Sequence, residues 1–147
     1  MDIDALETSF DLVAPKGDEL VDIFYSNLFA VAPSVKPLFD VTDMAKQHAM
    51  LLSALVLLRK SLRDLDAVVP TLKRLGARHV AYGARPEHYP VVGNVLIGAM
   101  AHVAGPDWDP RYAAIIHDFM MLDAMRETRA AKAATAQAIR FINERLA

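Results

Sequence analysis

Histidines are the residues of this chain best suited to hold a metal, because the sequence contains five of them and no cysteine. Without cysteine there are no disulfides, no zinc–thiolate sites and no cysteine nucleophiles, so a metal must be held by histidine or carboxylate side chains or within a cofactor. One of the five, His79, shares an expected helical face with Leu72, Leu75 and Gly76. A histidine on an apolar face is more often a core residue than a ligand, so its role depends on the features around it.

The common catalytic motifs are missing from the sequence. There is no HExxH, no GxSxG, no P-loop and no EF-hand loop. Acidic residues are scattered on polar faces, and Ser53 lies among leucines and alanines with no base nearby in the sequence. We expect His48 to be exposed, and we interpret the other three histidines as structural: His88, His102 and His117.

The composition is typical of one globular domain with a large apolar interior. The chain has 147 residues, of which 54% are hydrophobic, against a usual share of about 45–50%. A net charge of −2 with no clustered basic face argues against a nucleic-acid partner. The acidic start MDIDALETSF lacks the apolar core of a signal peptide, and the longest uncharged stretch, 89–106, is too short for a membrane span. We therefore expect a cytoplasmic protein.

The chain is expected to be all-α, because it shows neither alternating β-branched residues nor a hairpin turn. Asp4 is expected to cap the first helix, and Asp109 the last one, with Pro110 in its first turn. A short helical turn is expected over 33–39 and a charged connection over 61–66. The spacing of apolar residues predicts longer helices over about 4–13, 18–31, 42–60, 67–81, 90–105 and 110–147.

The order of these features resembles the globins, especially the bacterial single-domain haemoglobins and the globin domain of flavohaemoglobins. The strongest pieces are FYSNLFAVAPSVKPLFD (24–40) and LKRLGARHVAYGARPEHYPVVGNVLIGAM (72–100). His79 matches the family's proximal histidine, and a Tyr-Gly pair and then an HYP–VG segment follow it. Gln47 matches the distal polar position, and Tyr25 matches the distal tyrosine of bacterial members.

This resemblance implies a single globin domain over 1–147, folded as a three-over-three helical sandwich around a haem. The cofactor would be haem b, iron protoporphyrin IX, with His79 as the metal ligand. Tyr25 and Gln47 would donate hydrogen bonds to a gas on the distal side. The residues implied to contact the cofactor are Phe39, Leu51, Leu75, His79, Tyr89 and Val92.

The function implied by the resemblance is reversible binding of dioxygen and of other diatomic gases, with nitric oxide scavenging as a further role. One alternative is a haem enzyme, such as a nitric oxide dioxygenase, a peroxidase or a nitrite reductase, served by a separate reductase. Another is a gas sensor. An internal residue could also bind the iron as its sixth ligand, and the candidates are His48, Gln47 and Tyr25. The oligomeric state also stays open between a monomer and a homodimer that pairs through Ile139, Ile142 and Leu146.

The last expected helix departs from the family pattern. Flavohaemoglobin-type domains place a glutamate there, and this glutamate and the tyrosine that matches Tyr89 hydrogen-bond the proximal histidine. The ungapped match to the glutamate is Ala131, and Glu127 lies one turn earlier. The departure weakens the expectation of strong oxygen activation, because that activation depends on the hydrogen bonds behind the proximal ligand.

Overall fold

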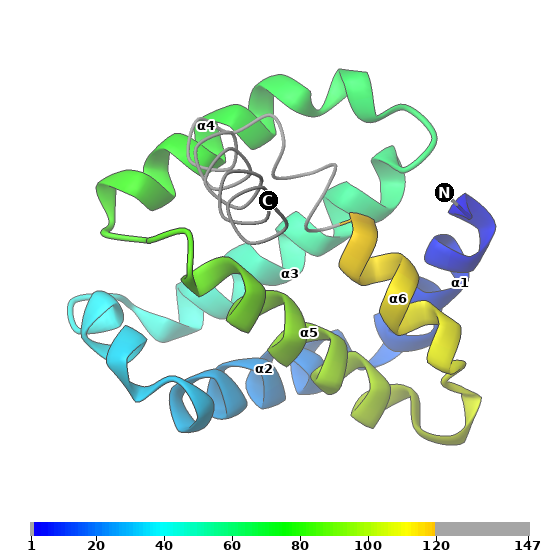
Figure 1. Cartoon of the computed structure of the whole chain (residues 1–147), viewed down its shortest axis with the longest axis horizontal. Coiled ribbons are helices and arrows are strands. Elements are labelled where there is room, and N and C mark those ends of the chain that lie inside the picture. The colour runs from blue at the N-terminus through cyan, green and yellow to red at the C-terminus, as the bar shows by residue number, and fades with distance from the viewer. Residues whose placement is uncertain (1, 120–147) are drawn as a thin grey trace, which may run out of the picture.

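The computed structural model describes residues 2–119, and within that range every regular element is helical (Figure 1). The expectation of an all-α chain is confirmed, and the part of the last helix expected beyond Phe119 lies outside the described residues. Short 3₁₀ turns lie at Ala14–Lys16, Pro33–Phe39 (η2), Leu65–Ala67 (η3) and Gly105–Asp107. The α-helices are α1 (Ile3–Val13), α2 (Gly17–Val31), α3 (Met44–Ser61), α4 (Val69–Ala81), α5 (His88–Ala104) and α6 (Pro110–Asp118).

Aspartate side chains begin three of these helices. Asp43 accepts hydrogen bonds from the amides of Ala45 and Lys46 at the start of α3. Asp109 caps α6, with Pro110 in the first turn as predicted. The prediction that Asp4 caps α1 is wrong. Asp2 does so instead, because its extended backbone lets its carboxylate reach the amide of Ala5, whereas Asp4 already lies in the first helical turn.

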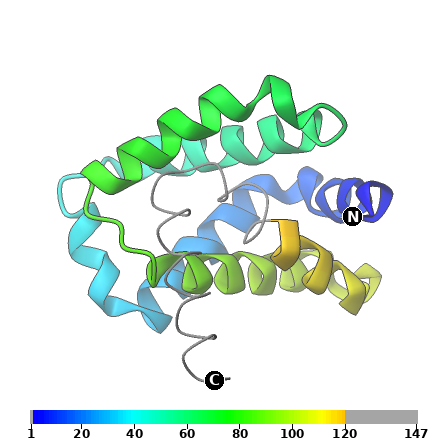
Figure 2. The same ribbon diagram turned by 45° about the horizontal axis from the view of Figure 1, so that its top comes forward.

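The core lies mainly where α2 packs against α5. α1 packs against α5 and α6, and together the helices form two layers, with α3 and α4 on one side of α2, α5 and α6 (Figure 2). The arrangement agrees with the predicted helical sandwich as far as the described residues extend. The buried apolar residues of the central pair are Leu20, Val21, Phe24, Tyr25, Leu28, Val95, Leu96, Ala99, Met100 and Val103.

A close crossing of α2 and α3 depends on Gly17. This glycine is buried, and a Cβ added there would lie 2.7 Å from Cδ1 of Leu52 on α3. Any larger residue would push the Leu52 side chain aside. The crossing sets the relative position of the two helices that carry Tyr25 and Gln47.

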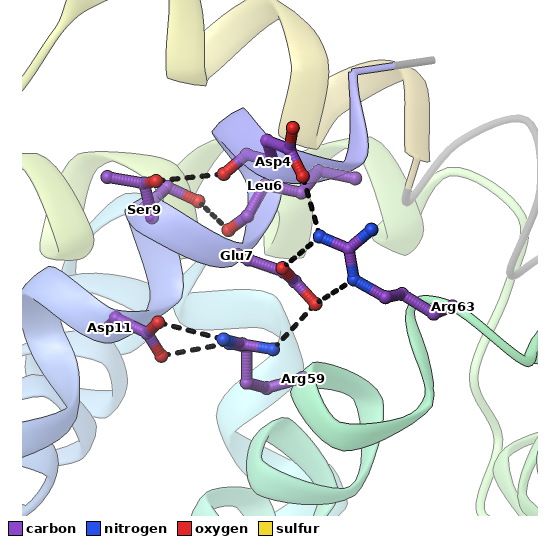
Figure 3. A network of polar contacts seen from close by, with 8 residues as sticks. Asp4, Leu6, Glu7, Ser9, Asp11, Arg59 and Arg63 are labelled. Carbon is purple, nitrogen blue, oxygen red and sulfur yellow. Dashed lines mark hydrogen bonds and ion pairs between the residues drawn. The ribbon is translucent and has the colours of Figure 1, made fainter.

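An ion-pair network joins α1 to the C-terminal end of α3 and the residues just after it (Figure 3). Arg59 donates two hydrogen bonds of 2.8 Å to the carboxylate of Asp11 and one of 2.9 Å to Glu7. Arg63 donates to Glu7 at 2.7 and 3.1 Å and to Asp4 at 2.6 Å. Individual surface ion pairs contribute little to the free energy of unfolding. This network instead fixes the position of α1 against the end of α3, because each arginine donates several hydrogen bonds in a forked geometry.

No helix of the described residues is long and apolar enough to cross a membrane. Most of the uncharged stretch forms α5, which supplies a large share of the core.

Candidate functional site

A hydrogen bond between neighbouring helices joins the two residues predicted on the distal side. The side-chain amide of Gln47 on α3 donates to the hydroxyl oxygen of Tyr25 on α2 at 2.9 Å. Tyr25 is 5% exposed. A tyrosine hydroxyl both accepts and donates. Because its oxygen accepts from Gln47, the hydroxyl proton remains available for a second partner.

The Tyr25 hydroxyl stays protonated at neutral pH. Burial raises the pKa of this group above its usual value, and the hydrogen bond from Gln47 lowers the pKa by less. A neutral phenol is a hydrogen-bond donor, whereas a phenolate only accepts. The environment therefore keeps Tyr25 in its donor form.

Aromatic rings surround the Tyr25 side chain. Phe39, at the end of η2, lies 5.9 Å from Tyr25 between ring centroids, and Phe29 lies at 6.0 Å. Phe29 and Phe39 also contact each other edge to face at 5.3 Å. The structure thus brings the predicted Phe39 beside Tyr25 and adds Phe29, which the sequence reasoning missed. Phe29 lies four residues after Tyr25, a helical spacing that could have indicated it.

His48 is not exposed as predicted, since it is half-buried beside Tyr25. Its ring stacks on the Tyr25 ring with centroids 4.9 Å apart and planes 4° from parallel. Its Nδ1 lies 3.0 Å from Oδ1 of Asp22 on α2. The prediction failed because Asp22 and Tyr25, three residues apart, share a face of α2 and together hold the imidazole.

The proximal candidate, His79, is on α4 in a form that suits metal ligation. Its Nδ1 lies 2.7 Å from the carbonyl oxygen of Leu75, so Nδ1 carries a proton and donates. In a neutral imidazole the lone pair then resides on Nε2. Among residues 2–119, no hydrogen bond to Nε2 is found.

The face of α4 around His79 is apolar and incompletely covered. Leu72, Leu75 and His79 are half-buried, although Gly76 between them is buried. Within the described range, α4 packs mainly against η3. Leu51, one turn after Gln47 on α3, is also half-buried against the core. These leucines could contact a flat apolar group held by His79.

Tyr89 and Val92 are both on α5. Val92 is half-buried against the core. The hydroxyl of Tyr89 is buried, and it has no hydrogen-bond partner in the described part of the chain. Burial raises the pKa of this hydroxyl. No hydrogen bond joins Tyr89 to His79, whose Nδ1 is already paired with Leu75, and the positions expected to match the family glutamate, Glu127 and Ala131, lie outside the described residues.

The remaining histidines lie apart from Tyr25 and Gln47. His88 accepts a hydrogen bond from the backbone amide of Arg85 at 3.1 Å and so shapes the start of α5. His102 on α5 and His117 on α6 are exposed. No group of three or more histidine and carboxylate side chains in residues 2–119 could hold a metal ion without a cofactor.

The family model for globins matches residues 22–125, more than half of the chain. The chain belongs to the globin family. The match covers most of α2 with Tyr25, and all of α3 with Gln47 and α4 with His79, so it includes the residues predicted on both the distal and the proximal side. The resemblance inferred from the sequence is confirmed.

The curated relatives include flavohemoproteins of bacilli. The chain is 32% identical to the flavohemoprotein of Bacillus thuringiensis subsp. konkukian over 130 residues, which cover 83% of this globin and 32% of that protein. It is 27% identical to the Bacillus subtilis flavohemoprotein over 131 residues, covering 82% and 33% of the two chains. This globin thus spans about one third of the length of these relatives.

Two solved structures share the fold at low sequence identity. A bacterial globin from Campylobacter jejuni matches with a TM-score of 0.74 and 22% identity, covering 91% of this chain and 96% of that one. An engineered carbene transferase from Rhodothermus marinus matches with a TM-score of 0.74 and 23% identity, covering 93% and 94%. At these identities the likeness establishes the globin fold only.

Membership of the globin family implies a haem cofactor, and the residues present fit one. His79 has the protonated Nδ1 and lone-pair Nε2 that an iron ligand needs. The half-buried leucines of α4 and α3 supply apolar contact area. Tyr25 supplies a hydrogen-bond donor whose own oxygen is already paired.

Proposed function

We propose that this globin binds one haem b through Nε2 of His79 and reversibly binds dioxygen, or another diatomic gas, beside Tyr25 and Gln47. The observation that carries the proposal is the 2.9 Å hydrogen bond from Gln47 to the Tyr25 hydroxyl. That bond leaves a buried, neutral donor on the distal side. When bound, the haem supplies the iron to which the gas attaches.

Each residue of the site has a distinct task in this proposal. The Leu75 carbonyl fixes the His79 ring and directs its Nε2 lone pair to the cofactor. Gln47 orients the Tyr25 hydroxyl, which donates its proton in a hydrogen bond to the gas. Phe39 and Leu51 provide apolar surface that limits access of water, while Val92 and Tyr89 contact the cofactor from α5. The haem is held without covalent attachment, because the chain has no cysteine for thioether bonds.

Slow release of dioxygen, with consumption of nitric oxide, is the physiological role we propose. Two polar side chains on the distal side favour long residence of a partly charged gas over easy delivery. The similarity to the globin third of flavohemoproteins supports a role that depends on electron supply. A separate reductase would deliver those electrons to this globin, which we expect to be a cytoplasmic monomer or homodimer in a single domain.

Absorption spectra of the purified chain in its ferric, ferrous and oxygenated forms test the proposal. We expect a red protein with a Soret band and about one haem per chain. A colourless protein that takes up no added haem would overturn the proposal. Nitric oxide consumption, measured with and without a supplied reductase, then separates gas storage from enzymatic turnover.

A further inference from the structure

Four side chains from α2 and α3 form a continuous set of contacts at the distal side. Asp22 on α2 pairs with Nδ1 of His48 on α3 at 3.0 Å. The His48 ring stacks on Tyr25 of α2, and the hydroxyl of Tyr25 accepts from Gln47 of α3. The set therefore starts on α2 with Asp22 and alternates between the two helices until it reaches Gln47.

The two neighbours on α3 hold different parts of Tyr25. Gln47 bonds the hydroxyl, while His48 covers a face of the ring. Phe24 contacts the same ring edge to face at 4.9 Å, with planes 77° apart. Rotation of the phenol would break its near-parallel alignment with His48 and displace the hydroxyl from Gln47.

Asp22 determines how His48 can lie. The side chain of Asp22 is 71% exposed and that of His48 is 31% exposed, so the pair lies at the outer edge of the site. The carboxylate lies within ion-pair distance of Nδ1 and restrains the imidazole. In this position His48 places Nδ1 beside Asp22 and stacks its ring face on Tyr25.

We propose that the Asp22–His48 pair positions Tyr25, holding the phenol ring so that its hydroxyl meets Gln47 and its proton is directed to the gas. In this proposal His48 is a positioning residue that acts through Tyr25. The effect on gas release rests on the function proposed above, whereas the effect on the Tyr25–Gln47 geometry does not.

The first test measures dioxygen and carbon monoxide release from the haem-loaded full chain. Asp22→Ala and His48→Ala should each raise the dioxygen dissociation rate about two- to tenfold, the range expected for loss of an aromatic contact. Carbon monoxide release should change much less. Asp22→Asn keeps the size of the side chain but removes the charge that lies beside Nδ1, so it should resemble Asp22→Ala. Asp18→Ala removes the same charge one turn earlier on α2 and should have no effect.

A double-variant comparison shows whether the pair acts through Tyr25. In a Tyr25→Phe background, His48→Ala should add little to the dioxygen dissociation rate, because the hydroxyl it positions is gone. Additive effects of the two substitutions would overturn the proposal. Equal acceleration of both gases would also overturn it, since that would indicate a general opening of the distal side.

A nuclear magnetic resonance measurement provides a readout that does not depend on gas binding. In the full chain as purified, the side-chain amide signal of Gln47 should shift in Asp22→Ala and remain in place in Asp18→Ala. An unchanged Gln47 signal, with only a lower unfolding temperature, would overturn the positioning role. If the chain bound no gas but the Gln47 signal shifted, the function proposed above would fail and the positioning role would stand.

Discussion

The Nδ1 atom of His79 lies 2.7 Å from the carbonyl oxygen of Leu75, one turn earlier in α4. The bond holds the imidazole plane against its own helix and settles which nitrogen carries the proton. A ligand fixed in this way loses little rotational freedom when it binds a metal, and its basicity is raised by the hydrogen bond it donates. A backbone group of α4 therefore fixes the orientation of His79, the candidate metal ligand.

The first prediction concerns the metal ligand. His79→Ala should abolish tight haem binding, or leave haem that exchanges readily and is restored by added imidazole, because the Nε2 donor is lost. The measurement is haem content and the Soret spectrum after gel filtration. His102→Ala and His117→Ala serve as controls, since both residues are exposed and should leave haem content unchanged. Loss of haem in His88→Ala but not in His79→Ala would refute the assignment of the ligand.

The second prediction concerns Tyr89, whose buried hydroxyl has no partner among residues 2–119. A buried polar group without a hydrogen bond destabilises the folded state, so Tyr89→Phe should leave the unfolding temperature unchanged or raise it. Tyr25→Phe is the matched control, and it should lower stability because it removes a formed hydrogen bond. The measurement is the thermal unfolding temperature of both variants against that of the unaltered chain. If Tyr89→Phe destabilised the chain by more than about 1 kcal/mol, its hydroxyl must be bonded to a residue outside that range.

The third prediction concerns the acid sensitivity of the network between α1 and α3. The hydrogen bond from Arg59 is the main cause that holds the pKa of Asp11 below its usual value, and the bond from Arg63 does the same for Glu7. A carboxyl whose pKa is lowered by folding stabilises the fold above its unfolded pKa, and this contribution is lost as the pH falls through the lowered value. The contribution should therefore be complete at neutral pH and disappear below about pH 4.

Arg59→Met tests this pH dependence. At pH 7 the variant should unfold a few degrees below the unaltered chain, and the difference should shrink as the pH falls below about 4. Lys60→Met removes the same charge from the adjacent exposed residue, which forms no ion pair within the described residues, and should show no such trend. A difference between Arg59→Met and the unaltered chain that stays constant from neutral to acid pH would point to lost packing rather than lost charge.

The sequence predicted the helices because they depend on local patterns, whereas the distal role of Tyr25 and Gln47 stays a prediction. Apolar spacing and capping aspartates indicate the helices, but they do not separate Asp2 from Asp4 at the start of α1, because both aspartates precede the same apolar pattern. Residue type and the family pattern were sufficient to select Tyr25 and Gln47 as candidates, and a hydrogen bond joins the two side chains in the structure. Whether His79 holds a haem stays a prediction, supported by an Nε2 atom that has no hydrogen-bond partner among residues 2–119.

The role of His48 could not be predicted because it depends on how two helices cross. Its position next to Gln47 suggested an exposed side chain, and nothing local indicated a contact with Asp22, which lies on a different helix. That contact requires the close approach of α2 and α3 that Gly17 permits beside Leu52. Tertiary geometry of this kind leaves no periodic signal in the sequence.

The fourth prediction concerns how long dioxygen stays. The Tyr25 hydroxyl is buried, neutral and already paired through its oxygen with Gln47, so its proton is free to bond the gas. Dioxygen bound in the site would carry partial negative charge. Hydrogen bonds to charged groups contribute about 1.5–3 kcal/mol. Tyr25→Phe should therefore raise the dioxygen dissociation rate about 10- to 150-fold.

Carbon monoxide supplies the control for Tyr25→Phe, because it draws less charge and its release should change far less. The decisive measurement is the pair of dissociation rates for the two gases, taken in the same preparation by stopped flow. Small, equal changes would mean that Tyr25 does not touch the gas and that Gln47 is the main donor. Large changes for both gases would mean that the ring, through its contacts with Phe39 and Phe29, shapes the distal side instead of donating a hydrogen bond.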